Sequence, residues 1–151
     1  MRPGEGRGDG PGRAGAFAIK VAIADPRAAT FVFDHQKTMY GGKRIAAGDR
    51  IFVFASENEG GAGLVAMGTV TSASASARKP GIERQTPRVS IRVERTALAT
   101  RRLGRAELKP FSHWDDGRPE TELNFKFYRQ ATNKIVGISA AAAAFLERFF
   151  T

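Results

Sequence analysis

The feature that most constrains the fold is a series of short apolar runs separated by turn residues. From Phe17 to Ile23 the large apolar residues occupy every second position, which is the period of a strand with one buried face. The run Ile51–Phe54 is continuously apolar, as is typical of a strand covered on both faces. Comparable runs recur at 31–33, 64–70, 89–94, 123–129 and 135–138. The sequence therefore predicts about five to seven strands.

The end of the chain predicts the clearest helix. Ser139 is a favourable N-cap, the alanines after it are strong helix formers, and the large apolar residues of 145–150 form one stripe. A short helix is expected at Arg105–Leu108, and one or two helical turns within 34–40. Gly68 indicates a bulge or a close backbone approach within its strand. The expected fold class is α+β and mostly β, a small barrel with short helices and a C-terminal helix at one end.

The positive charge belongs to the part of the chain that is expected to fold. Residues 1–15 are rich in Gly, Pro and Arg and are expected to form a flexible tail, followed by one domain over 16–151. The net charge is +9 and the tail holds three arginines against two carboxylates, so about +8 remains in the domain. Such a domain attracts polyanions; the alternative is a charge that serves solubility.

Composition also excludes several kinds of chemistry. The chain has no Cys, which removes disulfides, thiol catalysis and thiolate metal sites. The two histidines and the scattered carboxylates match no metal-ligand spacing, so neither a metal nor a cofactor is expected. Residues 1–15 contain no apolar signal region, and no run approaches the roughly 20 apolar residues of a membrane span. A cytoplasmic protein without a membrane partner is the expectation.

Two segments resemble a known family. Phe33–Lys37, followed by Ile45–Phe54 with its Gly-Asp turn and then by Leu64–Val70, resembles the EVE domains of the PUA-like superfamily over roughly residues 17–72. The Gly-Asp turn also occurs in the related ASCH domains, and Asp34 and His35 stand where EVE domains usually show Asn-Tyr. The resemblance implies a PUA-like pseudo-barrel whose pocket takes a flipped, often modified base while basic residues hold the nucleic-acid backbone.

The resemblance places the pocket mouth at Asp34, His35, Gln36 and Lys37, and its floor or rim at Phe54–Ser56. His35 and Gln36 have the donors and acceptors to read a base edge. Trp114 lies in a polar stretch beside a turn and would stack on a base, or else close the core. The candidate base-binding residues are therefore Asp34, His35, Gln36, Phe54, Ser56 and Trp114.

The candidate phosphate-binding residues are exposed cations on loops or strand exteriors, and their alternative is a solvated face. They are Lys37, Lys43, Arg44, Arg78 and Lys79.

Three functions follow from these residues. The first is a non-catalytic nucleic-acid-binding module that accepts a single, modified base. The second is a small hydrolase of the ASCH type, acting on RNA or a nucleoside derivative, with His35 and Asp34 or His113 and Asp115 as base and orienting group. The third is a scaffold for an acidic protein partner. The sequence leaves the choice between DNA and RNA, the oligomeric state and the question of catalysis open.

Overall fold

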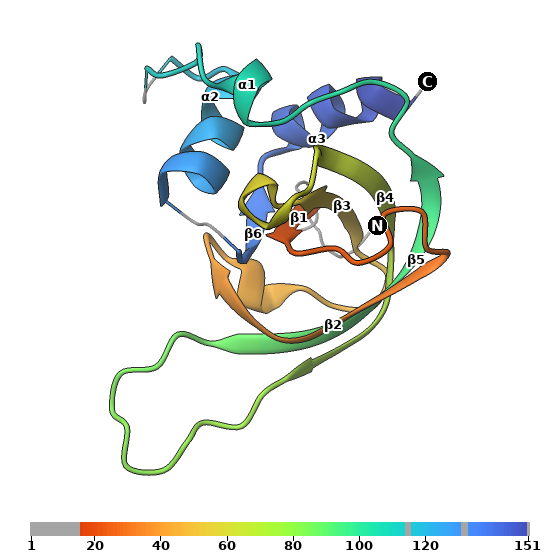
Figure 1. The fold of residues 1–151 in the computed structure, drawn as a ribbon. Helices are drawn as coiled ribbons and strands as arrows, with labels where there is room; N and C mark the ends of the chain where they lie inside the picture. Colours follow the sequence, from red (N-terminus) through yellow and green to blue (C-terminus); the bar gives the residue numbers. More distant parts are fainter. Residues whose placement is uncertain (1–15, 114–115, 131–132, 151) are drawn as a thin grey trace, which may run out of the picture.

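The chain forms a closed six-stranded β-barrel in a computed structural model that describes residues 16–113, 116–130 and 133–150 (Figure 1). Neighbouring strands pair in the order β1 (Ala16–Val21), β3 (Arg50–Ala55), β4 (Gly63–Ala75), β5 (Arg88–Leu98), β2 (Thr30–Met39) and β6 (Ile135–Ile138). The β1–β3 and β2–β6 pairs are parallel and the others antiparallel. The number of strands lies within the predicted range.

The helices cover the barrel away from the long β4–β5 hairpin (Figure 1). They are α1 (Arg105–Leu108), α2 (Pro119–Asn124), which continues as a π-helix over Phe125–Gln130, and α3 (Ala140–Glu147), which ends in a 3-10 turn over Arg148–Phe150. Two further 3-10 turns lie between strands, η2 (Gly42–Arg44) and η3 (Glu57–Glu59). No helix among the described residues is both long and apolar enough to cross a membrane.

Two apolar layers lie on the two faces of the barrel wall. One fills the barrel interior and includes Ile51 and Val53. The other lies between the wall and the helices, where Phe54 packs on Phe127 with ring centroids 5.0 Å apart. Each residue of Ile51–Phe54 has 0% exposure, which confirms the strand covered on both faces.

The C-terminal helix agrees with the prediction. The Ser139 hydroxyl accepts a hydrogen bond from the Ala142 amide at 3.0 Å, which is the contact of an N-cap. Leu146 is fully buried against the sheet layer, and the Phe150 ring lies 6.0 Å from that of Phe52. The expected helix at Arg105–Leu108 is also confirmed.

The strand expected at 123–129 is wrong, because this segment is the end of α2 and its π-helical continuation. The alternation of large apolar residues there is equally compatible with a helix, since Leu123 and Phe127 are four residues apart and both fully buried. Pro119 in the first turn, with Glu120 and Glu122 after it, is the helix-start signal that identifies the segment.

This helix also covers the second face of β1, which was expected to face solvent. Lys20 is 0% exposed; its Nζ donates to the Phe127 carbonyl at 2.7 Å and lies 4.2 Å from the centre of the Tyr128 ring. Burial lowers the pKa of Lys20, partly opposed by the nearby Glu57 carboxylate. The Tyr128 hydroxyl donates to Glu57 at 2.9 Å, and burial together with that carboxylate raises the pKa of Tyr128.

The helical turns expected within 34–40 are also wrong. Residues up to Met39 remain in β2, because they pair with β5 and then with β6. The close approach predicted at Gly68 is confirmed: the pairing register shifts there, and a Cβ on Gly68 would lie 2.7 Å from Val93 Cγ1.

Candidate nucleic-acid interface

A β-bulge in β2 organises the candidate interface. Phe33 pairs with Ile91 and Gln36 with Val89, so β2 holds one more residue than β5 between these two pairs. His35 lies in this bulge with a φ of 53°, in the left-handed region that few residues other than glycine adopt.

Three contacts hold His35 in this strained conformation. Its amide donates to the Ser90 hydroxyl at 2.9 Å, and its carbonyl accepts from the Arg88 guanidinium at 2.8 Å. Its Nδ1 lies 2.8 Å from the Ser76 hydroxyl, which belongs to the connection between β4 and β5. The bulge therefore directs the imidazole toward that connection.

The ends of β4 and β5, with residues 76–87 between them, form an arm that projects from the barrel (Figure 1). At its base the Ser76 amide donates to the Arg88 carbonyl at 2.9 Å. At its tip the Gln85 side chain donates to the carbonyls of Lys79 and Ile82, each at 2.8 Å, and accepts from the Lys79 amide at 2.9 Å. The tip thus has its own hydrogen-bonded framework.

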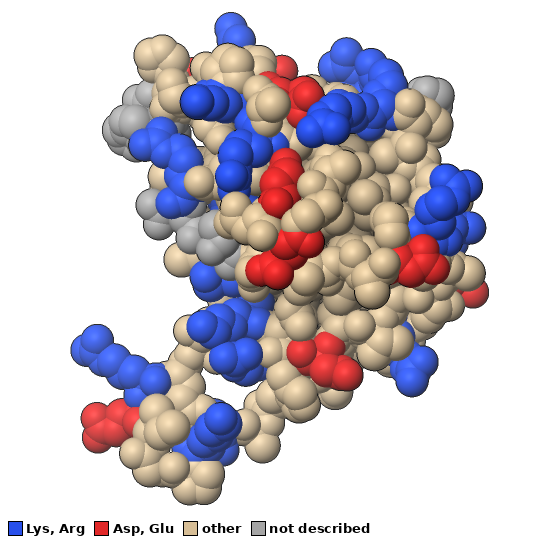
Figure 2. Space-filling view, in the orientation of Figure 1, with Lys and Arg blue, Asp and Glu red and all other residues tan. Residues whose placement is uncertain are grey.

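A cavity of about 920 Å³, called the basic cradle below, lies between the arm and the barrel. Four permanent cations line it: Lys43 from η2, Arg78 and Lys79 from the arm, and Arg88 from β5, together with His35. The described residues that line the cradle include no carboxylate. Figure 2 shows Lys and Arg side chains on the arm and on the part of the barrel beside it. The cradle is therefore suited to an anion.

A second hollow of about 560 Å³ adjoins the cradle and shares His35 and Arg88 with it. Its other lining residues are Asp34, Gln36, Lys37, Asn133 and Lys134, so it is called the bulge hollow. The Gln36 side-chain nitrogen donates to the Asp34 carbonyl at 2.9 Å. The side-chain oxygen of Gln36 can therefore accept a hydrogen bond from a ligand.

The structure brings together most of the residues predicted for the site. Asp34, His35, Gln36, Lys37, Lys43, Arg78 and Lys79 all line the cradle or the bulge hollow. It does not bring the remaining ones there.

Phe54 has 0% exposure, because Phe127 in the continuation of α2 packs on it, and Ser56, the residue after β3, has 1%. The Ser56 hydroxyl has no hydrogen-bond partner among the described residues. Arg44 lines a different cleft, described below, and Trp114 lies outside the described residues.

The pairs considered for acid–base chemistry are arranged differently from the expectation. The contact recorded for His35 Nδ1 is the Ser76 hydroxyl and not the Asp34 carboxylate. His113 is exposed, and its proposed partner Asp115 lies outside the described residues. In the described part of the chain no group of three or more His, Asp or Glu side chains is placed to hold a metal ion.

Several lining residues were missing from the predicted site. Arg88 is detectable from the sequence as a cation on the polar face of the strand 89–94, next to the predicted loop. Ser76, Asn133 and Lys134 give no such signal, because only the barrel closure and the arm bring them beside the bulge.

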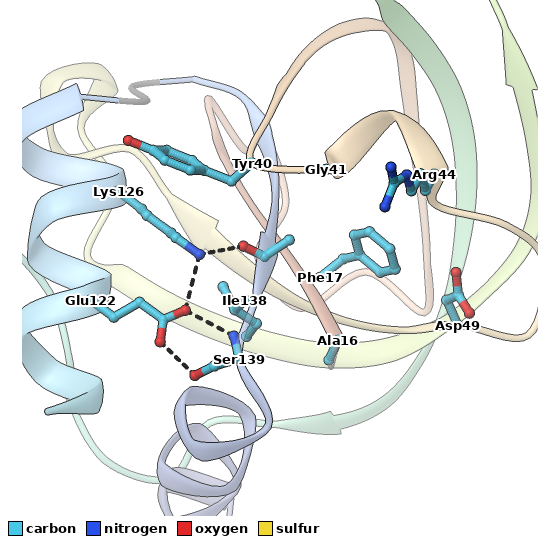
Figure 3. Close-up of a pocket in the computed structure, with 11 residues that line it drawn as sticks. Ala16, Phe17, Tyr40, Gly41, Arg44, Asp49, Glu122, Lys126, Ile138 and Ser139 are labelled. Atoms are coloured by element: carbon cyan, nitrogen blue, oxygen red, sulfur yellow. Dashed lines mark hydrogen bonds and ion pairs between the residues drawn. The ribbon is translucent and has the colours of Figure 1, made fainter. Parts of the chain in front are cut away.

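A separate cleft of about 550 Å³, the η2 cleft, lies between η2, β1, β6 and α2 (Figure 3). Lys126 Nζ donates to Glu122 at 3.0 Å and to the Gly137 carbonyl at 2.7 Å, and it lies 4.9 Å from the centre of the Tyr40 ring. Burial acts to raise the pKa of Glu122, but the hydrogen bonds from Ser139 and the charge of Lys126 outweigh it and lower this pKa. The carboxylate is therefore ionised and fully engaged.

The fold is shared with solved structures of low sequence identity. No protein-family model and no curated protein sequence matches the chain. The human THYN1 protein in complex with 5-methylcytosine-containing DNA has a TM-score of 0.58 and 15% identity, covering 87% of this chain and 94% of that one. The DUF55 domain of human thymocyte nuclear protein 1 has a TM-score of 0.60 and 15% identity, with coverages of 86% and 95%.

A hypothetical protein from Leishmania major has a TM-score of 0.58 and 17% identity, with coverages of 89% and 92%. These similarities and the closed mixed barrel show a PUA-like pseudo-barrel fold. The fold implied by the sequence resemblance is confirmed. At these identities the likeness concerns the fold, and the function rests on the site itself.

Proposed function

We propose that this protein is a non-catalytic nucleic-acid-binding module whose basic cradle holds the phosphate backbone. The observation that carries the proposal is the convergence of Lys43 from η2 with Arg78, Lys79 and Arg88 from the β4–β5 hairpin on one cavity, which no carboxylate of the described residues lines. Cations that merely keep a protein soluble repel one another and have no reason to converge on a concave surface. A polyanion relieves that repulsion and releases its own counterions on binding.

The fold similarity supports the same partner. The human THYN1 protein, which has this fold, has been solved with DNA that contains 5-methylcytosine. A pseudo-barrel of this kind is thus compatible with a bound nucleic acid, and the cradle is the part of this chain with the matching charge.

The finer part of the proposal is that one base, preferably modified, enters the bulge hollow. Asp34, His35 and Gln36 present a carboxylate, an imidazole and an amide there, which together donate to and accept from a base edge. The adjacent cradle holds the phosphates on either side, so the cost of unstacking, a few kcal/mol, is offset by hydrogen bonds and contacts in the hollow. Trp114 remains a predicted stacking partner.

The test separates phosphate binding from base recognition. Fluorescence anisotropy would measure the affinities of labelled DNA and RNA with and without one 5-methylcytosine. Lys43→Ala is expected to weaken binding to all probes by the same factor. His35→Gly, chosen because glycine tolerates the left-handed backbone, is expected to weaken binding mainly to the preferred base.

The matched control is Lys109→Ala, which removes one exposed cation next to α1, far from the arm in Figure 1. This variant should bind like the wild type. If His35→Gly and Lys43→Ala reduce binding to modified and unmodified probes equally, the base-recognition part is refuted. If no probe binds the wild type, the whole proposal is refuted.

A further inference from the structure

Tyr40, at the edge of the η2 cleft, is held in an unfavourable backbone conformation. Its φ is 53° and that of the following Gly41 is 81°, so two consecutive residues are left-handed. The turn is fixed by β6: the Gly137 amide donates to the Tyr40 carbonyl at 3.1 Å, and a Cβ on Gly137 would collide with that carbonyl. The Tyr40 ring packs edge-on against Phe125, with ring centroids 6.4 Å apart, and the residue remains 38% exposed. Backbone strain at a partly exposed aromatic residue is typical of ligand-binding sites.

The charges of the cleft are balanced, unlike those of the cradle. Arg44 and Lys126 are matched by Asp49 and Glu122 among the residues that line it. Glu122 is held by Lys126 and Ser139, and Asp49 accepts a hydrogen bond from the Ala46 amide at 2.8 Å. Such a cleft does not draw a phosphate into its interior. It suits an uncharged, flat and partly polar group, for which Phe17 and Tyr40 provide aromatic walls.

The cleft and the cradle lie on the two sides of η2. Lys43 lines the cradle and the next residue, Arg44, lines the cleft. Figure 3 shows Arg44 at the η2 edge of the cleft, with Phe17 between it and Lys126. A strand held by its phosphates in the cradle would therefore meet the cleft after crossing η2. The cleft volume of about 550 Å³ lies within the range of roughly 300–1,000 Å³ usual for small-molecule sites.

From these features we propose that the η2 cleft binds an unpaired base of the same nucleic-acid strand, with Arg44 on the phosphate at η2. The base lies against Tyr40, and Lys126 has one N–H beyond those given to Glu122 and Gly137 with which to donate to a base oxygen or nitrogen. This inference rests on the proposed function. It adds a preference for a single-stranded overhang or gap beside the segment in the cradle.

The experiment compares two probes with the same duplex, one blunt and one with a short single-stranded overhang. The wild type should bind the overhang probe more tightly. Tyr40→Ala should remove roughly five- to hundredfold of the affinity for the overhang probe, since stacking on an aromatic side chain contributes that much, and leave the blunt probe unchanged. Tyr40→Phe keeps the ring and should retain the preference.

Two further readouts make the result independent of the stability of the Tyr40 variant. Arg44→Ala, at the exposed rim, should weaken overhang binding more than blunt binding. A photoreactive 4-thiothymidine in the overhang should cross-link to a peptide that contains Phe17 or Tyr40.

Equal affinity of the wild type for the two probes, or cross-links only elsewhere, would refute the cleft while leaving the cradle intact. Absence of binding to both probes would refute the proposed function together with this inference.

Discussion

Removing one cation from the basic cradle should change the salt dependence of DNA binding by a fixed amount. The cradle offers four permanent charges, Lys43, Arg78, Lys79 and Arg88. If each neutralises one phosphate of duplex DNA, the slope of log K against log salt concentration should be about −3.6. The affinity should then fall about 150-fold between 50 and 200 mM salt.

Lys43→Ala should reduce this slope to about −2.7 and the fall to about 40-fold. At 0.15 M salt the variant should bind about fivefold more weakly, whatever the DNA sequence, because a phosphate contact carries no sequence information. Lys43 is the suitable position because it belongs to η2 and takes no part in the hydrogen-bonded framework of the arm.

The assay is fluorescence anisotropy of a labelled duplex at five or more salt concentrations, with Lys109→Ala as the control of equal charge change. The control should keep the wild-type slope. A wild-type slope near zero would show that the cradle does not hold phosphates. A loss for Lys109→Ala equal to that for Lys43→Ala would show that net charge alone attracts the DNA.

Three further predictions concern the framework of the site, and chemical denaturation measures each of them. Glu122→Gln should lower the free energy of unfolding at pH 7 by about 1–3 kcal/mol, because charged hydrogen bonds are lost. The pKa of Glu122 is lowered in the folded state, so the stabilisation by its carboxylate is present above pH 4.5 and is lost as the pH falls through the lower folded-state pKa. The stabilities of the wild type and the variant should therefore converge in acid. A constant difference between them down to pH 2 would contradict this. Gly42→Ala should lower the free energy of unfolding by roughly 2–4 kcal/mol, because the new Cβ would collide with the Ile135 carbonyl. Gly48→Ala, in open space at a φ of 95°, should lower it by only about 1–2 kcal/mol. Equal losses would refute the close contact of η2 with β6. Phe127→Ala, at a fully buried position, should cost about 3–5 kcal/mol, and a cost below 1 kcal/mol would refute the packing of the π-helix on β3.

The strands were predictable where one face alternates or where both faces are apolar. The run Phe17–Ile23 overlaps β1, and Ile51–Phe54 lies within β3. The alanine run capped by Ser139 forms α3. The segment 123–129 could not be assigned by its alternation, because apolar residues at 123, 125 and 127 satisfy both a strand and one turn of helix. Because this helix was not predicted, the burial of Lys20 was not predicted either. A lysine in an alternating strand indicates a face exposed to solvent unless another element is known to cover that face.

The candidate site was predictable only in part. The family resemblance directed attention to Asp34–Lys37, and charge directed it to Lys43, Arg78 and Lys79, all of which line the two adjoining hollows. The bulge at His35 could not be foreseen, because a register shift depends on the partner strand. Phe54 and Ser56 were expected on the floor or rim of the pocket, but both are buried, and Phe54 is covered by Phe127 of the π-helix, whose position the sequence did not reveal.

Nucleic acid should bind between the arm and the β2 bulge. The most direct test is a titration of ¹⁵N-labelled protein with a short duplex that contains one 5-methylcytosine, followed by the amide resonances. The largest shift changes should fall on His35, Ser76, Arg88 and the arm between them, with little change at α1. Changes concentrated on α1 or α3, or no changes at a DNA excess, would contradict it.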